Sequence, residues 1–479
     1  MADSFLFYDL ETFGQDPRRT RIAQFAAIRT DAALNEIDEP VSFHVRPADD
    51  LLPSPYATLV TGITPQHALA EGVSEAEAFA RINELMSRPG TCALGYNTLR
   101  FDDEFIRHGL FRNFLDPYER EWRNGNSRWD LLDMLRLMHA LRPDGITWPK
   151  REDGATSFKL EHLAEANGVR EGDAHEALSD VRATIGLARL FRTAQPRLWE
   201  YALRLRDKRF VAGLLDVTAL QPLLHISMRY PATRLCAAPV LPLAVHPSIN
   251  SRYIVFDLDG DVDALLELPA ETLAERLYLR ASELPEGVAR VPLKEVHANK
   301  VPALVAWNHL RRDDHARLGL DVAAIEAKVE RLRPHAAELA EKARRVFGGV
   351  REGAPADVDA SIYDGFLGAG DKPLLASVRT TAPQQLAGLE GAFNDPRLPE
   401  LLFRYRARNH PDSLDEAARR RWNHYRQRRL LGEESLGELN LQTYRGQLDL
   451  LAAEAPDDAR RSALLQALRD WGQHLEETL

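Results

Sequence analysis

The chain has 479 residues, of which 44% are hydrophobic and 28% are charged, a composition typical of a globular protein with two or three domains. No apolar stretch is long enough to span a bilayer, the amino terminus lacks a basic-then-apolar leader, and the formal net charge is −11. The two cysteines, Cys92 and Cys236, lie far apart in sequence, so we expect a reduced, cytoplasmic protein that is not bound to a membrane.

The first part of the chain alternates between short apolar runs and helix-forming segments. Strands are predicted in the short runs, at Phe5–Tyr8, Ile22–Arg29, Val41–Val45 and Thr91–Gly95. Helices are predicted at Ser74–Met86, Leu131–Leu141, Phe158–Asn167 and His175–Arg192. This order is typical of a layered α/β domain, in which ligands gather beyond the carboxyl ends of the strands.

The composition changes after Gln195-Pro196. Two β-rich segments follow, Arg252–Leu258 and Arg290–Val296, and then a helix-prone stretch, Asp321–Arg345. Residues 348–355 contain several glycines and a proline and are predicted to be a linker. The remainder is rich in Ala, Leu, Glu and Arg and is predicted to be helical. We therefore predict three domains, at residues 1–196, 197–350 and 351–479.

Two carboxylates stand at the end of the first predicted strand. Side chains alternate across a strand, so Asp9 and Glu11 are expected to point to the same side. Like charges are costly to bury together unless they share a proton, meet a basic partner or bind a metal ion. The alternative is that one carboxylate caps the next helix and the other is solvated.

Two further motifs accompany this pair. Asn97 precedes Phe101 and Asp102, where an apolar segment runs into an acidic helix start, and His175 stands five residues before Asp180. In this order the motifs resemble those of the DEDDh 3′-to-5′ exonuclease superfamily. Within it, the chain resembles the bacterial exodeoxyribonuclease I family over residues 9–14, 24–31, 62–65, 126–130 and 405–409.

The resemblance implies both a fold and a set of site residues. The fold is an α/β ribonuclease-H-like exonuclease domain with a mixed sheet, followed by a small β-barrel domain of the Src-homology type with helical additions and a helical C-terminal domain. The positions that match the catalytic motif are Asp9, Glu11, Asp102 and Asp180, as metal ligands, and His175.

These residue types suit phosphodiester hydrolysis. Two divalent ions about 4 Å apart can activate water, neutralise the transition state and stabilise the leaving oxygen. Carboxylate oxygens favour Mg²⁺, and Mn²⁺ can substitute for it. His175 would act as general base because imidazole titrates near neutral pH, the alternative being a capping or surface residue. Asp103 follows Asp102 directly; the motif selects Asp102, and we expect Asp103 to be a first-turn helix residue favoured by the macrodipole.

Other residues are candidates for contacts with a nucleic acid substrate. By motif position, Thr12, Phe13, Asn97 and Phe101 would surround the terminal nucleotide, although both phenylalanines fit ordinary core packing equally well. Lys159 is a candidate phosphate contact, the alternative being a solvated lysine.

A later segment interleaves arginines with aromatic residues. Arg404, Arg406 and Arg408 alternate with Tyr405 and its neighbours, as in grooves that bind single strands. The alternative is a pair of amphipathic helices with ion-paired arginines and core aromatic residues.

The leading interpretation is a magnesium-dependent exonuclease that removes nucleoside 5′-monophosphates from the 3′ end of single-stranded DNA, in DNA repair and recombination. The preference for DNA comes from the resemblance alone. The alternatives are a 3′ exonuclease acting on RNA ends or mispaired termini, and a single-strand-binding protein with a relic nuclease site. With a net charge of −11, DNA binding requires basic residues gathered along one groove.

The resemblance also implies a protein partner, the acidic carboxyl tail of single-stranded DNA-binding protein. Arg142 and Tyr201 match the family's tail pocket. Residues 340–342 lack the expected arginine, so Arg344 or Arg345 are candidate substitutes. We expect the protein to be a monomer.

Overall fold

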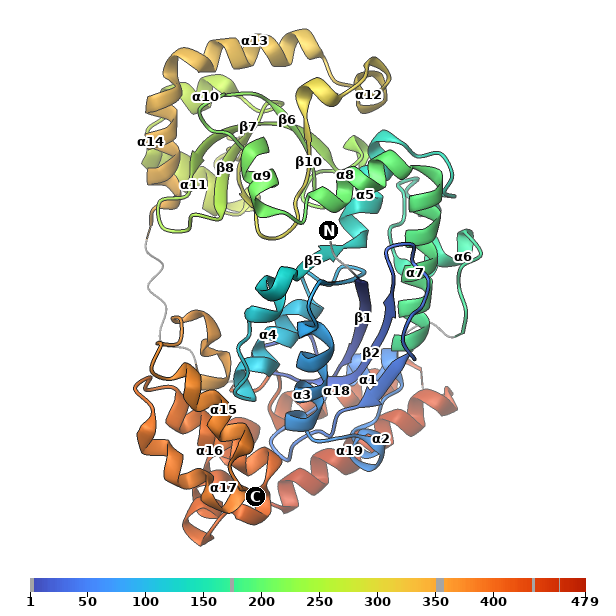
Figure 1. Cartoon of the computed structure of the whole chain (residues 1–479), viewed down its shortest axis with the longest axis vertical. Coiled ribbons are helices and arrows are strands. Elements are labelled where there is room, and N and C mark those ends of the chain that lie inside the picture. Colours follow the sequence, from blue (N-terminus) through green and yellow to red (C-terminus); the bar gives the residue numbers. More distant parts are fainter. Residues whose placement is uncertain (1–3, 173–175, 350–356, 433–435, 456) are drawn as a thin grey trace. The chain divides into compact units, whose positions relative to one another are not determined.

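The computed structural model describes residues 4–172, 176–349, 357–432, 436–455 and 457–479 (Figure 1). The chain forms two compact units. The first unit comprises residues 1–127, 171–185 and 353–479, and the second comprises residues 128–170 and 186–352. His175 lies outside the described residues, so its predicted role stays a prediction. Among the described residues, no helix has the length and apolar character needed to cross a membrane.

A mixed sheet forms the centre of the first unit, with the strand order β3-β2-β1-β4. β1 (Ser4–Thr12) pairs antiparallel with β2 (Ile22–Thr30) and parallel with β4 (Thr91–Gly95), and β2 pairs antiparallel with β3 (Val41–His44). The four predicted strands are confirmed. β1 runs four residues further than predicted because its polar end continues the ladder with β2.

The helices of the first unit come from both ends of the chain. They are α1 (Pro55–Thr61), α2 (Pro65–Glu71), α3 (Glu75–Ser87), α4 (Asp102–Arg112), α15 (Lys372–Thr380), α16 (Leu398–Asn409), α17 (Glu416–Leu431), α18 (Leu441–Glu454) and α19 (Ala459–Glu477). Figure 1 shows α19 beside α1 and α2, at the lower edge of this unit. Leu52 shares an apolar cluster with Tyr444 and Trp471, and the Trp471 indole donates to the Leu51 carbonyl over 2.9 Å. The carboxyl-terminal helices therefore complete the core of the first unit.

The second unit contains an antiparallel sheet with the strand order β10-β6-β7-β8-β9. Its strands are β6 (Leu223–Ile226), β7 (Ala237–Val245), β8 (Arg252–Asp257), β9 (Leu293–His297) and β10 (Ala303–Ala306). Its helices are α5 (Leu131–Leu141), α6 (Leu160–Ala166), α8 (Pro196–Arg204), α9 (Lys208–Leu214), α10 (Val262–Glu267), α11 (Ala270–Tyr278), α12 (Arg312–Leu318), α13 (Val322–Leu332) and α14 (Ala336–Phe347). Strand β5 (Ser127–Asp130) and helix α7 (Ala177–Ala194) each span a boundary between the units.

Local sequence signals explain where these helices begin and end. The helix-prone stretch Asp321–Arg345 is confirmed as helical, and a 3₁₀ turn at Arg333–His335 divides it into α13 and α14. Pro334 in that turn has no backbone N–H to donate and breaks the α-helical ladder. Ser74 is the N-cap of α3 rather than its first residue, since its side chain accepts from the Glu77 N–H.

Candidate active site

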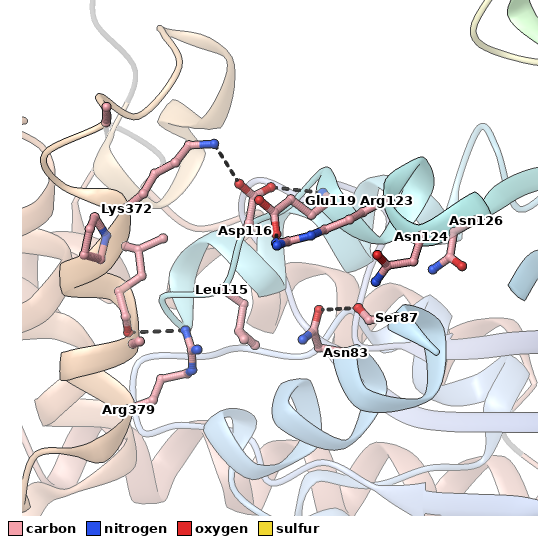
Figure 2. Close-up of a pocket in the computed structure, with 14 residues that line it drawn as sticks. Asn83, Ser87, Leu115, Asp116, Glu119, Arg123, Asn124, Asn126, Lys372 and Arg379 are labelled. Atoms are coloured by element: carbon pink, nitrogen blue, oxygen red, sulfur yellow. Dashed lines mark hydrogen bonds and ion pairs between the residues drawn. The ribbon is translucent and has the colours of Figure 1, made fainter. Parts of the chain in front are cut away.

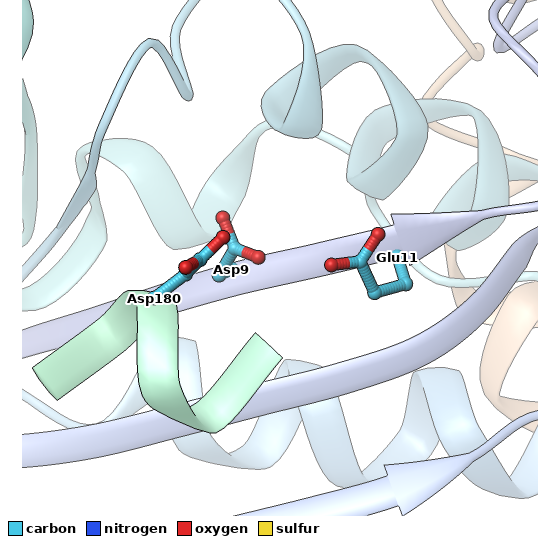
Figure 3. A group of neighbouring side chains, drawn as sticks. All are labelled: Asp9, Glu11 and Asp180. Atoms are coloured by element: carbon cyan, nitrogen blue, oxygen red, sulfur yellow. The ribbon is translucent and has the colours of Figure 1, made fainter. Parts of the chain in front are cut away.

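Three carboxylates meet near the carboxyl end of β1 (Figure 3). Asp9 and Glu11 belong to β1, and Asp180 belongs to the first turn of α7. Each residue offers one oxygen, and these oxygens all lie within 4.8 Å of one another. Glu11 is buried, whereas Asp9 and Asp180 are half-buried. Three clustered carboxylates form a ligand set for a hard divalent cation such as Mg²⁺.

The strand itself fixes the spacing of the first two acids. Asp9 is opposite Ala26 of β2 and Glu11 is opposite Gln24, so both side chains lie on one face of the sheet. The register shifts between Glu11 and Thr12. Such irregularities are common beside active sites because they change the direction of the strand and of the side chains that follow. Here the shift ends the regular ladder directly after the second acid.

Asp102 joins this cluster through the backbone of β1. It is the first residue of α4 and is buried, and its Oδ1 accepts a hydrogen bond from the Leu10 N–H over 3.1 Å. Leu10 lies between Asp9 and Glu11, so this bond brings the fourth acid of the motif beside the other three. Asn97, with a φ of 66°, makes the left-handed turn that leads from β4 into α4.

Asp103 has a different environment from Asp102. It lies in the first turn of α4, as predicted, but it is also buried and paired. Its Oδ1 accepts from the Tyr8 hydroxyl over 2.9 Å and from the Arg120 guanidinium over 2.7 Å. Asp103 therefore anchors α4 to β1 and to the segment that follows α4.

Glu11 is a carboxylate of the cluster whose ionised form is strongly opposed, first by burial and then by its acidic neighbours. Burial raises the pKa of Glu11 to about 8, and the charges of Asp180, Asp102 and Glu176 add to this effect. A bound divalent cation would reverse the shift and favour the ionised form. The sequence prediction did not include Glu176. Its position one turn before Asp180 was the signal, because residues four apart share a helix face.

Thr12 and Phe13 are both buried rather than exposed at a surface. Phe13 is 2% exposed and packs with Ala23, Leu51 and Ile63. The Thr12 hydroxyl donates to the Gly14 carbonyl over 2.6 Å. These contacts favour the core-packing alternative for Phe13.

The other predicted substrate contacts, at Phe101, Asn97 and Lys159, are more accessible to solvent. Phe101 and Asn97 are half-buried, and the Phe101 ring lies 5.0 Å from that of Phe105. Lys159 is exposed in the second unit, where it precedes α6 and its ammonium lies 3.4 Å from Glu161.

The three interleaved arginines of α16 are buried in ion pairs. Arg404 pairs with Asp357 at 2.6 Å, and Arg406 pairs with Glu390 at 3.1 Å. Arg408 lies between Asp359 and Asp50, at 2.6 and 2.8 Å. The aromatic neighbours Phe403, Tyr405, Trp422 and Tyr425 are buried as well. The structure thus favours the alternative of ion-paired helices over a phosphate-binding groove. Most of the carboxylates come from distant segments, and Glu400, one turn before Arg404, pairs with it as well.

The residues that match the tail pocket both lie in the second unit. Arg142 forms an ion pair with Asp314, and the Tyr201 hydroxyl donates to the Leu304 carbonyl over 2.8 Å. The candidate substitutes on α14 face other groups: Arg345 pairs with Glu271 of α11, and Arg344 lies 3.4 Å from Glu341.

A separate cavity of about 660 Å³ lies in the first unit (Figure 2). Its walls come from α3, from the segment after α4 and from α15, and Lys372 lies 3.3 Å from Asp116 at one side. The described residues that line it include none of the predicted site residues.

Comparison with known proteins extends these observations to the whole chain. The family model for an exonuclease matches residues 6–188, that for the exonuclease I SH3-like domain matches residues 206–349, and that for the exonuclease I C-terminal domain matches residues 356–475. These matches confirm the predicted fold class.

The relatives cover the chain almost completely. Exodeoxyribonuclease I of Escherichia coli strain K12 is 45% identical, over 98% of both chains. The crystal structure of E. coli exonuclease I in complex with a dA16 oligonucleotide is 45% identical, covers 100% of both chains and has a TM-score of 0.94. A crystal structure of SSB/exonuclease I with the inhibitor CFAM is 44% identical, with a TM-score of 0.90, and covers 99% of this chain and 100% of its own. The chain therefore belongs to the exodeoxyribonuclease I family of exonucleases.

Proposed function

We propose that the protein is a magnesium-dependent exonuclease that releases nucleoside 5′-monophosphates from the 3′ end of single-stranded DNA by two-metal-ion hydrolysis. The observation that carries this proposal is the carboxylate cluster of Asp9, Glu11 and Asp180, with Asp102 held against Leu10 beside it. The full-length similarity to an enzyme crystallised with a dA16 oligonucleotide supports single-stranded DNA as the substrate.

In this proposal the four acids would hold the metal ions and His175 would act as the general base. Bound divalent ions supply charge neutralisation and lower the pKa of a coordinated water. Asp9, Glu11 and Asp180, with Asp102 held beside them by the Leu10 N–H, would hold those ions. His175 accepts the proton of the attacking water, since imidazole titrates in the physiological range.

Three further assignments belong to this proposal. The chain divides into domains at residues 1–196, 197–350 and 351–479. The protein acts as a cytoplasmic monomer in DNA repair and recombination. It binds the acidic tail of single-stranded DNA-binding protein through Arg142 and Tyr201, a partner supported by the SSB/exonuclease I crystal structure.

A nuclease assay on matched substrates tests the central claim. Uniformly labelled single-stranded DNA, RNA of the same sequence and blunt duplex DNA are incubated with the full chain in Mg²⁺ or in EDTA. We expect mononucleotides from single-stranded DNA in Mg²⁺ only, and no comparable product from the Asp9→Asn variant. The control is Glu84→Gln, which removes an exposed carboxylate from α3 of the same unit.

Each other outcome identifies a different function. Faster degradation of RNA than of DNA would support the RNA-end alternative. Tight binding of single strands without release of nucleotides would support a binding protein with a relic site. Full activity in Asp9→Asn would contradict the two-metal assignment.

A further inference from the structure

Two histidines at the edge of the first unit's sheet lie outside the proposed reaction. His44 is the last residue of the edge strand β3, and His67 lies in α2. Their Nε2 atoms are 3.2 Å apart, and the two rings are inclined at 76° with centroids 4.7 Å apart. His67 is exposed and His44 is half-buried.

This separation is the one that a shared metal ion requires. Two imidazole nitrogens bound to one tetrahedral Zn²⁺, with bonds of about 2.0–2.1 Å, are separated by roughly 3.3 Å. A hydrogen bond between two neutral imidazoles gives a similar distance, with one Nε2 donating to the other. Burial lowers the pKa of His44 and the neighbouring His67 lowers it further, which favours the neutral ring that a metal needs.

The backbone holds the two histidines in place without the help of their side chains. The His44 carbonyl accepts from the Val73 N–H over 3.0 Å, and the Arg46 N–H donates to the Val73 carbonyl over 2.9 Å. Gly72 permits this approach, because a Cβ there would lie 3.0 Å from the His44 oxygen and 2.9 Å from the Arg46 nitrogen. On the other side, the Thr64 side chain accepts from the His67 N–H at the start of α2. The end of β3 and the whole of α2 therefore form one rigid frame.

A third ligand is available on the same helix. Glu71 is exposed and follows His67 by one turn, so the two side chains share a face of α2. The Glu71 charge already acts on the His44 ring, because it partly opposes the lowering of that ring's pKa. We therefore take Glu71 as the candidate third ligand on its helical spacing from His67.

We propose that His44 and His67, completed by Glu71 and water, bind one divalent transition-metal ion of the class that prefers imidazole, such as Zn²⁺ or Ni²⁺. This site differs from the carboxylate cluster in place and in chemistry. Glu11 is opposite Gln24 and Gln24 is opposite His44, so two strand spacings, roughly 10 Å, separate the positions. Nitrogen ligands favour Ni²⁺ and Zn²⁺, whereas the all-oxygen cluster favours Mg²⁺.

Calorimetric titration with Ni²⁺ in excess Mg²⁺ tests the site separately from nuclease function. The full chain carries no added histidine tag and contains Asp9→Asn and Asp180→Asn, which disable the carboxylate cluster. We expect one Ni²⁺ per chain. His67→Gln should weaken binding at least about tenfold, and Glu71→Gln should weaken it less, since changes even outside the direct ligands cost about 10–100-fold. His67 is exposed, so its replacement should not disturb folding.

The matched control is His335→Gln, because His335 is an exposed histidine three residues before Glu338 in the second unit. It should leave Ni²⁺ binding unchanged. Electron paramagnetic resonance of bound Cu²⁺ should show nitrogen coupling that is lost with His67→Gln. If Ni²⁺ stoichiometry and affinity are the same with and without His67, or if His335→Gln has an equal effect, the proposal is overturned and the two rings share only a hydrogen bond.

Discussion

Glu11 and Asp50 are both buried carboxylates of the first unit, yet their surroundings carry opposite charge. Asp50 lies 2.8 Å from Arg408 and 3.4 Å from Arg429. Burial alone would raise the pKa of Asp50, but Arg408, Arg429 and Arg21 outweigh it and hold that pKa well below its usual range. Around Glu11, burial and neighbouring acids act in the same direction and raise the pKa to about 8.

This is the difference expected between a carboxylate that stabilises the fold and one that binds a cation. The charge of Asp50 is neutralised by the protein itself, and the ion pairs join α16 and α17 to the segment before α1. The charge of Glu11 is opposed by its neighbours, so its ionised form gains from a cation supplied from solution. Burial therefore does not distinguish the two roles, whereas the sign of the neighbouring charges does.

Removing the charge of Asp50 should cause the largest loss of stability. Asp50→Asn leaves Arg429 buried without its carboxylate and Arg408 with Asp359 in place of two carboxylates. This should lower the free energy of unfolding by about 3–5 kcal/mol. Urea denaturation measures the loss, and activity per folded molecule should stay near that of the parent. Asp412→Asn, at an exposed carboxylate, is the control. A change below about 1 kcal/mol would show that the arginines find other partners.

Glu11→Gln should have the opposite profile, with a loss of activity and no loss of stability. Removing a group that stabilises transition-state charge costs a factor of about 10²–10³ in turnover, or roughly 2.7–4 kcal/mol. Without metal, the melting temperature should stay the same or rise, because burial and the neighbouring acids oppose the ionised form of Glu11, which glutamine cannot adopt. Single-turnover cleavage measures the loss of activity and a melting curve measures the stability, with Glu84→Gln as the control. Retained activity would remove Glu11 from the metal site.

The sequence predicts that Asp9 and Glu11 lie on one face of the first strand, because local rules suffice for that placement. Asp9 and Glu11 follow an apolar run, and the period of two places them on one face. The motif position selects Asp102 over Asp103, and the two residues differ in their contacts: Asp102 accepts from the Leu10 N–H and Asp103 from the Tyr8 hydroxyl. The sequence does not show that Asp103 is buried against Arg120, since that contact depends on the segment after α4.

The role of the arginines in α16 could not be decided from the sequence. Arg404, Arg406 and Arg408 with aromatic neighbours fit a groove and an ion-paired core equally well. The deciding carboxylates, Asp50 and Asp359, lie hundreds or tens of residues away and arrive only through folding. His44 and His67 were missed for the same reason, because residues on a strand and on a later helix follow no common period.

The two carboxylates should also give the protein opposite responses to pH. The pKa of Glu11 is raised above its unfolded value of 4.5, so its contribution to stability is present below that pH and is lost as the pH rises through about 8. The pKa of Asp50 is depressed, so its contribution is lost only as the pH falls below about 3.8. Without metal, the melting temperature should decline between pH 6 and pH 9 by a few degrees more in the parent than in Glu11→Gln, a difference on the scale of about 1 kcal/mol or more. Mg²⁺ should reduce that difference, and an equal decline in both proteins would contradict the raised pKa.

The smallest expected effect concerns an exposed arginine of α17, the helix that follows α16. Arg420 of α17 is 69% exposed and pairs with Glu416, itself 86% exposed. Arg420→Gln should change the free energy of unfolding by only a few tenths of a kcal/mol, because exposed ion pairs contribute little. Its effect on single-stranded DNA binding is measured as affinity against salt concentration. We expect an unchanged slope for Arg420→Gln and also for Arg406→Gln, whose side chain is held by Glu390. A fall of roughly 0.7 in the log–log slope for either variant would mean that this arginine contacts a phosphate. Such a fall for Arg420 alone would assign DNA contact to the exposed arginines and leave the buried ones to hold the fold.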